Sequence, residues 1–233
     1  EVEKGKTQAP YYYVFPVKQH DQSELANLVN LLNEHGVKAF ALNHDVHYNT
    51  TLFAKGDIII PLAQPFRAFI KEMLESQVFP ERHYTPDGEL IEPYDITSWS
   101  LPLHKGVKVF EINADKNLFD GNYTEISYPL SFFEKSDVEF QSVLLSANQN
   151  NSYLLVFRAL QKGLQVERTI EDYLYKGDVY PAGSFIIKNT QALHEVLKDI
   201  TFKPLYINED IHVSKQKINN PRIALLESYF HPM

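Results

Sequence analysis

A spacing of apolar residues occurs twice along the chain. Between residues 66 and 73 apolar side chains recur at i, i+3, i+4 and i+7, which is the spacing of one helix face, and the same spacing returns between residues 193 and 200. Each pattern follows a short apolar run opened by a glycine, at residues 58–60 and 185–187. Such a run is too short for a helix and predicts a buried strand.

These patterns belong to a longer repeat. Residues 28–74 align with residues 155–201 without insertion or deletion, and ten of the 47 aligned positions are identical. The identical pairs are Leu28/Leu155, Val29/Val156, Gly36/Gly163, Asp45/Asp172, Tyr48/Tyr175, Gly56/Gly183, Ile59/Ile186, Ile60/Ile187, Gln64/Gln191 and Lys71/Lys198. Because the identities coincide with matching helix and strand patterns, we expect one supersecondary unit to be encoded twice.

The order of the expected elements predicts the fold class. Each repeat reads strand, helix, strand, strand, helix, with a polar loop at residues 43–55 of the first copy. Asp21 followed by Glu24 is a helix-start signal, and Gly36 and Gly163 are helix-stop signals. Alternating strands and helices favour an α/β sandwich of helices on a mixed, largely parallel sheet, with pseudo-twofold symmetry between the two internal repeats.

The same patterns predict how the chain is divided. Residues 1–112 hold the first repeat unit and a connection, residues 113–141 a linker, and residues 142–208 the second repeat unit. Residues 209–233 form a C-terminal segment with a strand at 222–226, and we expect that strand to lead into a missing module. Since the chain starts at Glu1 without a methionine, we interpret it as a fragment or a mature form.

Composition excludes several classes of function. The 233 residues carry a net charge of -8, which leaves no basic stripe for nucleic acid. Apolar runs are far shorter than the roughly 20 residues that cross a bilayer, so no membrane insertion is expected. The absence of cysteine excludes disulfides and thiolate-held metals, and it fits either the cytoplasm or the periplasm.

Two aspartate and tyrosine pairs are the first candidate site. Asp45 and Tyr48 recur as Asp172 and Tyr175, in loops of the kind where α/β units bind ligands. Pseudo-twofold symmetry would bring both pairs to one cleft between the repeats. The alternative is structural, because an aspartate can close a turn and a tyrosine can cover the edge of a core.

Two histidines and an arginine are weaker candidates. His44 and His47 are three residues apart and could share a zinc ion with Asp45 as a further ligand, which gives a hydrolase hypothesis. The second copy has Glu171 and Leu174 at the histidine positions, so a plain polar loop is the alternative. Arg67 could face a ligand or pack in the core. No Walker loop, nucleophile elbow, Gly-x-Gly-x-x-Gly turn or His-Glu-x-x-His motif is present.

Extended phrases resemble a known family. GDIIIPLAQPFRAFIKEML at 56–74, PYDITSWSLPL at 93–103 and YPAGSF at 180–185 are similar to the region downstream of the catalytic domain in large bacterial zinc carboxypeptidase-like proteins, relatives of carboxypeptidase A. PRIALL at 221–226 resembles the start of the amidotransferase-like module that follows in such chains. The family holds zinc with His-x-x-Glu and a distant histidine, but no histidine of this chain has glutamate three residues later.

The resemblance therefore implies a parent protein and withholds its activity from this part. We expect a non-catalytic accessory region without zinc of its own, which packs on the missing catalytic domain and helps to hold a peptide or cell-wall-derived substrate. The resemblance also implies a periplasmic or secreted location. The alternative hypothesis is a stand-alone small-molecule or peptide binding module, with its site between the two repeats.

Overall fold

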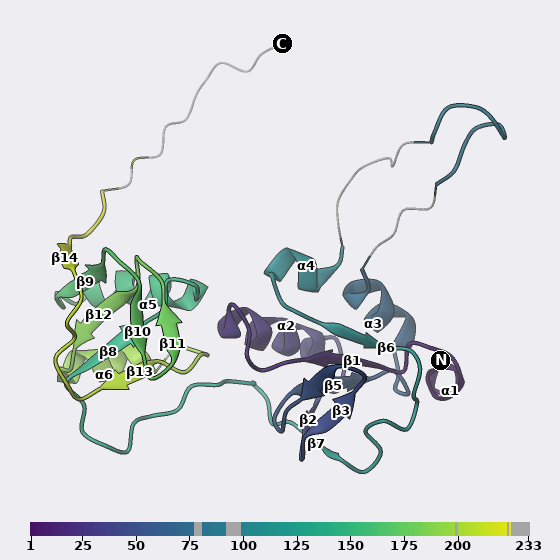
Figure 1. The fold of residues 1–233 in the computed structure, drawn as a ribbon, viewed down its shortest axis with the longest axis horizontal. Coiled ribbons are helices and arrows are strands. Elements are labelled where there is room, and N and C mark those ends of the chain that lie inside the picture. The colour runs from purple at the N-terminus through teal and green to yellow at the C-terminus, as the bar shows by residue number, and fades with distance from the viewer. Residues whose placement is uncertain (77–80, 92–98, 199, 223, 225–233) are drawn as a thin grey trace. The chain divides into compact units, whose positions relative to one another are not determined.

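The computed structural model describes residues 1–76, 81–91, 99–198, 200–222 and 224, and it divides the chain into two compact units, 1–133 and 134–233 (Figure 1). Over the described residues the chain forms 14 strands and six helices. In that part of the chain each unit has one five-stranded sheet and one two-stranded hairpin. None of the described helices is long and apolar enough to span a membrane.

The first unit is organised around a sheet with the strand order β6-β1-β5-β2-β7. Its strands are β1 (Tyr12–Phe15), β2 (Phe40–Leu42), β5 (Ile58–Pro61), β6 (Phe110–Ile112) and β7 (Tyr123–Glu125). The residues between β2 and β5 form a hairpin of β3 (Val46–Tyr48) and β4 (Thr51–Phe53). The helices of this unit are α1 (Val2–Thr7), α2 (Gln22–Glu34), α3 (Arg67–Leu74) and α4 (Leu101–Lys105).

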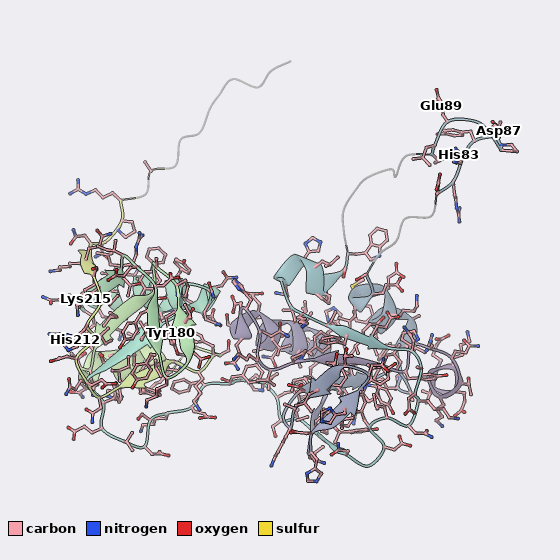
Figure 2. The ribbon with its side chains drawn as sticks, viewed as in Figure 1. His83, Asp87, Glu89, Tyr180, His212 and Lys215 are labelled. Carbon is pink, nitrogen blue, oxygen red and sulfur yellow. The ribbon has the colours of Figure 1, made fainter. Side chains whose placement is uncertain are left out.

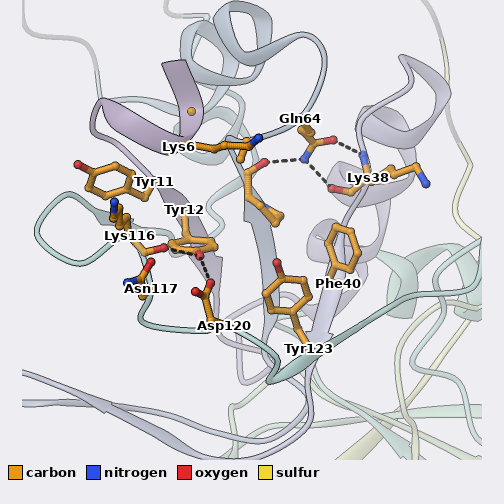
Figure 3. A pocket seen from close by; sticks show the side chains of 13 residues that line it. Lys6, Tyr11, Tyr12, Lys38, Phe40, Gln64, Lys116, Asn117, Asp120 and Tyr123 are labelled. Carbon is orange, nitrogen blue, oxygen red and sulfur yellow. Dashed lines mark hydrogen bonds between the residues drawn. The ribbon is translucent and has the colours of Figure 1, made fainter. Parts of the chain in front are cut away.

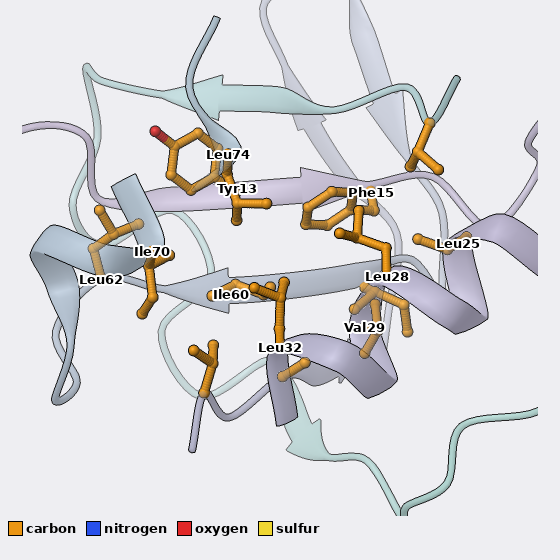
Figure 4. Close-up of a cluster of buried hydrophobic side chains, with 14 residues drawn as sticks. Tyr13, Phe15, Leu25, Leu28, Val29, Leu32, Ile60, Leu62, Ile70 and Leu74 are labelled. Atoms are coloured by element: carbon orange, nitrogen blue, oxygen red, sulfur yellow. The ribbon is translucent and has the colours of Figure 1, made fainter. Parts of the chain in front are cut away.

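Both faces of the first sheet are buried. Ile58 and Ile60 belong to a cluster with the apolar faces of α2 and α3 (Figure 4). Ile59 points to the opposite face, where it packs with Phe53 of the hairpin and with Phe119. Successive residues of β5 therefore enter two different cores, which is why this strand is a continuous apolar run in the sequence.

The second unit has the strand order β13-β8-β12-β9-β14. Its strands are β8 (Ser142–Leu145), β9 (Val166–Thr169), β12 (Phe185–Lys188), β13 (Leu205–Ile207) and β14 (Lys215–Ile218). Its hairpin consists of β10 (Tyr173–Tyr175) and β11 (Asp178–Tyr180), and its helices are α5 (Asn150–Gln161) and α6 (Gln191–Leu197). Elements therefore follow one another in the same spatial order in the two units. A pseudo-twofold relation between them stays a prediction.

Strand registers define which residues are equivalent. Tyr12 lies opposite Pro61 in the first sheet, as Ser142 lies opposite Lys188 in the second. Phe40 pairs with Ile59 where Glu167 pairs with Ile186. At the edge, Leu42 pairs with Tyr123 and Thr169 pairs with Lys215. The equivalent pairs are Tyr12/Ser142, Phe40/Glu167, Pro61/Lys188 and Tyr123/Lys215.

The prediction of an α/β sandwich with a mixed, largely parallel sheet is wrong. Every strand pairing among the described residues is antiparallel. In the first unit β1, α2 and β2 do form a crossover between strands of the same direction, but β5 lies between these strands and runs against both. The apolar run of β5 suggested a parallel sheet because the hairpin, rather than a second layer of helices, buries its other face.

The helix ends agree with the sequence. Asp21 caps α2, as predicted, by accepting hydrogen bonds from the backbone N–H groups of Ser23 at 2.9 Å and Glu24 at 3.2 Å. Gly36 and Gly163 follow α2 and α5 with positive φ values of 83° and 76°. A side chain at these positions would be strained, which explains why glycine ends both helices.

Three sequence segments contain elements beyond those expected. The polar loop 43–55 folds as the β3–β4 hairpin. The segment 113–141 contributes β7 to the first sheet, and the segment 209–233 contributes β14 to the second. These edge strands are three and four residues long, which is too short for a clear alternating pattern. The strand expected at 222–226 falls largely on residues outside the described part of the chain.

Candidate functional site

The two predicted aspartates close the bases of their hairpins. An Asp45 carboxylate oxygen accepts a hydrogen bond from the backbone N–H of Lys55 at 2.7 Å. Asp172 accepts the equivalent bond from Ala182, also at 2.7 Å. This geometry matches the structural alternative for both residues, since each carboxylate compensates a turn donor. A joint site formed by the two units stays a prediction.

The tyrosines of the two pairs pack under their own hairpins. Tyr48 is half-buried against the aromatic cluster around Phe53. Tyr175 packs against the smaller cluster around Ile186, and its ring lies 6.0 Å from that of Tyr173. Each ring thus covers the outer face of its sheet, as expected for a large half-buried aromatic side chain.

The weaker candidates also have defined places. His44 and His47 are exposed, and in the described part of the chain no three histidine, aspartate or glutamate side chains are grouped to hold a metal ion. This includes the turn that carries His83, Asp87 and Glu89 (Figure 2). The described structure therefore does not group His44, Asp45 and His47 as the three ligands that zinc-dependent hydrolysis at this loop would need.

Arg67 is buried and acts as an anchor. Its Nη2 donates to the backbone carbonyl of Gln8 at 3.1 Å and to that of Ala9 at 3.0 Å. These bonds fix the segment that joins α1 to β1. Charge-assisted bonds of this kind are among the stronger hydrogen bonds in proteins. Arg67 therefore holds the N-terminal segment against the first unit.

A cavity of about 420 Å³ lies in the first unit (Figure 3). It opens on the hairpin face of the sheet, beside the cluster that contains Tyr12. Its lining comes from α1, the row across β1, β5 and β2, the turn after β5, the loop after β6 and the start of β7. The lining residues are Gly5, Lys6, Tyr11, Tyr12, Lys38, Phe40, Pro61, Ala63, Gln64, Lys116, Asn117, Asp120 and Tyr123.

One wall of the cavity depends on a glycine. A Cβ atom at Gly5 would stand 2.0 Å from the backbone oxygen of Leu62, closer than any real contact. Only glycine therefore lets α1 approach the backbone after β5 this closely. Together with the Arg67 anchor, this contact places Lys6 at the rim of the cavity.

Gln64 and Tyr12 fix the remaining walls. The buried Gln64 amide donates to the carbonyls of Lys38 at 2.9 Å and Pro61 at 2.7 Å, and it accepts from Lys38 N at 2.8 Å. The Tyr12 hydroxyl donates to the carbonyl of Lys116 at 2.7 Å and lies 3.4 Å from an Asp120 oxygen. The Gln64 bonds join the segment before β2 to the end of β5, and the Tyr12 bond ties the loop after β6 to β1. The walls are thus held in place without a ligand, so the cavity is preformed.

The charges around the cavity are mostly positive. Lys6, Lys38 and Lys116 come from three different segments of the chain, and Asp120 is the single acidic residue in the lining. This excess contrasts with the net charge of -8 of the whole chain. Burial, and then the Asp120 carboxylate, raise the pKa of the Tyr12 and Tyr123 hydroxyls, so both phenols stay protonated near neutral pH.

The second unit has a cavity of about 190 Å³ at the equivalent place. It is lined by Gln141, Ser142, Glu167, Ile186, Lys188, Glu209, Asp210, Ile211 and Lys215. Glu167 replaces Phe40, and Lys215 of β14 replaces Tyr123. These two replacements form an ion pair at 3.2 Å. The same backbone thus carries an aromatic cavity in one unit and a charged one in the other.

The sequence contains only part of the signal for the first-unit cavity. The Tyr11–Tyr13 run marks an aromatic strand, but Lys116, Asp120 and Tyr123 fall in the segment expected to be a linker. The 127-residue offset also ends before that segment, so the alignment does not reveal their counterparts. Comparison of the chain with protein-family models, with curated proteins and with solved structures finds no match in any of the three.

Proposed function

We propose that this chain is a non-catalytic binding region whose ligand site is the first-unit cavity. The observation that carries the proposal is a preformed cavity of about 420 Å³ with aromatic walls and a lysine rim. Its volume lies within the range of roughly 300 to 1,000 Å³ that small-molecule sites occupy. The site lies within one unit and does not use Asp45 or Tyr48.

The lining favours binding over catalysis. General acid–base chemistry needs two titratable groups placed on either side of a reacting bond, and nucleophilic catalysis needs an activated hydroxyl, thiol or amine. Among the lining residues Asp120 is the one carboxylate, and there is no histidine, serine, threonine or cysteine. Two of the three lysine amines, those of Lys6 and Lys38, form ion pairs with Glu3 and Glu125. The Tyr12 hydroxyl is engaged with the Lys116 carbonyl. The residues present can hold and orient a ligand.

We further propose that this binding region is an accessory part of a zinc carboxypeptidase-like protein. The phrases at residues 56–74, 93–103 and 180–185 support this parentage. In this proposal zinc belongs to the catalytic domain of the parent, the amidotransferase-like module follows the chain, and the location is periplasmic or secreted. The accessory region would then hold part of the peptide or cell-wall-derived substrate.

Binding is tested by NMR on the intact chain. A library of small acids, bases and neutral compounds is titrated while backbone amide shifts are followed. We expect some members to shift Lys38, Phe40, Gln64 and Tyr123. The equivalent residues of the second unit, Glu167 and Lys188 among them, serve as the internal control. A library without any member that shifts the cavity residues would refute the binding function.

The absence of catalysis is tested separately. We expect the isolated chain neither to bind zinc stoichiometrically nor to release C-terminal amino acids from peptides. Metal analysis after dialysis against zinc and a carboxypeptidase assay provide the two measurements. The described residues contain no group of three side chains that could hold zinc, which is the basis of this expectation. Stoichiometric zinc together with peptide hydrolysis would overturn the non-catalytic proposal.

A further inference from the structure

We infer that the first-unit cavity takes a carboxylate carried on a flat aromatic body, with its charge at the lysine rim and its ring between Phe40, Tyr123 and Tyr12. This inference rests on the proposed binding function and names the class of ligand. Three observations carry it: the charges of the rim, the engagement of the Gln64 amide and the Tyr12 hydroxyl in hydrogen bonds, and the fixed aromatic walls.

The rim offers cationic donors that can turn to an anion. Lys116 Nζ has no carboxylate partner among the described residues. Lys6 pairs with Glu3 at 2.8 Å and Lys38 pairs with Glu125 at 3.2 Å, both on the exposed surface. Exposed pairs of this kind are weak and exchange easily. An anion beside an ammonium group in a partly enclosed cavity gains more than it would beside the same group in water.

Two neutral polar side chains of the lining, Gln64 and Tyr12, already make hydrogen bonds within the protein. The Gln64 amide makes three hydrogen bonds to the backbone of residues 38 and 61. The Tyr12 hydroxyl donates its single proton to the Lys116 carbonyl. A ligand that depended on these groups would have to break bonds that hold the cavity open. The positive charges of the lining are those of its lysines, so recognition of the charge of an anion falls to them.

The aromatic walls are held rigidly. The rings of Phe40 and Tyr123 meet edge to face, with centroids 5.0 Å apart and planes at 67° (Figure 3). Tyr12 is fixed in the same way by Phe119, at 5.0 Å and 87°. Rings locked by their neighbours present flat apolar surfaces that lose little freedom on binding. Such walls suit an aromatic ring better than a flexible chain.

The equivalent cavity of the second unit has neither the aromatic walls nor the positive charge of the first-unit cavity. Glu167, Lys188 and Lys215 stand where Phe40, Pro61 and Tyr123 stand in the first unit. The smaller cavity there has three carboxylates among its lining, and Glu167 is paired with Lys215. It offers neither an aromatic wall nor an excess of positive charge. The two units thus provide a matched control within one chain.

The test uses three carboxylates and their primary amides on the intact chain: benzoate, phenylacetate and N-acetyl-L-phenylalanine. Calorimetry and NMR titration measure each dissociation constant. We expect at least one acid to bind in the first-unit cavity about tenfold or more tightly than its amide. We expect that advantage to shrink between 20 mM and 500 mM NaCl, because salt screens the lysine rim.

Variants assign the effect to residues. Lys116→Gln should weaken binding of the acid threefold or more and leave the amide unchanged. Phe40→Glu, which installs the second-unit residue, should weaken the amide by tenfold or more through loss of the aromatic wall, and the acid by more, because the new carboxylate also repels it. The matched control Lys188→Gln makes the same lysine change in the other cavity and should alter neither. Amide spectra of each variant verify folding, and the exposed Lys116→Gln is expected to fold normally.

The outcomes separate the two proposals. If an acid and its amide bind the cavity equally, or if only uncharged or cationic library members shift it, the inference of an anionic ligand is overturned while the binding function stands. If Lys188→Gln weakens the acid as much as Lys116→Gln does, the inference is overturned as well. If no compound of any charge shifts the cavity residues, the proposed function itself fails.

Discussion

The two units use one backbone plan to present different surfaces. Their sheets share strand order and register, and both hairpins are closed by an aspartate. Yet the row that lines the first cavity with Phe40 and Tyr123 carries Glu167 and Lys215 in the second unit. The fold therefore depends on the buried strands and turn bonds, while the row at the sheet end varies without changing the register.

A second contrast shows how one contact is kept with different chemistry. Asp57 accepts from the backbone N–H groups of Val17 and Ala54, both at 2.9 Å. Burial raises the pKa of Asp57, and these two donors act in the opposite direction. In the second unit Ser184 takes this place. Its hydroxyl accepts from Ala147 N at 3.2 Å and donates to the Pro181 carbonyl at 2.7 Å.

The exchange of Asp57 for Ser184 follows from a proline. Pro181 stands where Ala54 stands, and proline has no N–H to donate. A carboxylate at this place would keep one donor instead of two, whereas a hydroxyl can both accept and donate. The side chain at this turn is thus set by its backbone neighbour, and the two solutions are not interchangeable.

The largest effect is expected from the central strands. Ile59→Ala and Ile186→Ala remove identical buried side chains at equivalent positions, so each should destabilise its own unit by roughly 2–5 kcal/mol. Ile59 lies among the rings of Phe53 and Phe119, so its loss should be the larger of the two. Hydrogen exchange in each sheet measures both units separately. If one of the two variants loosened its own sheet and the other did not, the equivalence of β5 and β12 would be contradicted.

The next effect concerns the turn contact. Asp57→Ser should cost about 1–3 kcal/mol, because a single hydroxyl leaves one of two part-buried N–H donors unsatisfied. Ser184→Asp should cost a similar amount, because it buries a carboxylate beside the Pro181 carbonyl. Urea denaturation followed by unit-specific amide signals measures both. If Ser184→Asp were neutral, the explanation from proline would be wrong.

The hairpin aspartates should have equal and smaller effects. Asp45→Ala and Asp172→Ala each remove one backbone-to-carboxylate bond of 2.7 Å at an exposed turn, at an expected cost of about 1 kcal/mol. Binding in the first-unit cavity should not change, since neither residue lines it. Denaturation and the benzoate titration provide the two readouts. Loss of binding in either variant would contradict the assignment of the ligand to the first-unit cavity.

These contrasts also show what the sequence can predict. The Asp21 cap and the glycine stops are local signals, and the structure agrees with them. The spacing at residues 66–73 indicates a helix but not its buried face, because α3 buries Arg67, Ile70 and Leu74 while Phe66 is 55% exposed. Strand direction is not local, because the insertion of β5 between β1 and β2 depends on pairing that the apolar run of β5 does not specify. The cavity could not be predicted from the sequence, because the short edge strand β7 and the loop after β6, which line it, have no periodic pattern.

The smallest effect is expected on α5, where the two units differ in what covers a helix. In the first unit Asn30 of α2 donates to the backbone carbonyl of Leu130 at 3.0 Å and accepts from its N–H at 2.7 Å. These bonds hold the segment after β7 along α2. The equivalent residue of α5 is Phe157, which is 44% exposed beside Leu154 at 41%.

Phe157→Asn should therefore change the free energy of unfolding by no more than about 0.5 kcal/mol and reduce binding of a hydrophobic dye. The reverse change Asn30→Phe should cost about 1–3 kcal/mol, because it leaves the Leu130 backbone groups unpaired. Denaturation and dye fluorescence measure the pair. A loss above about 1 kcal/mol for Phe157→Asn would mean that this ring is buried in solution, and the contrast between α2 and α5 would then disappear.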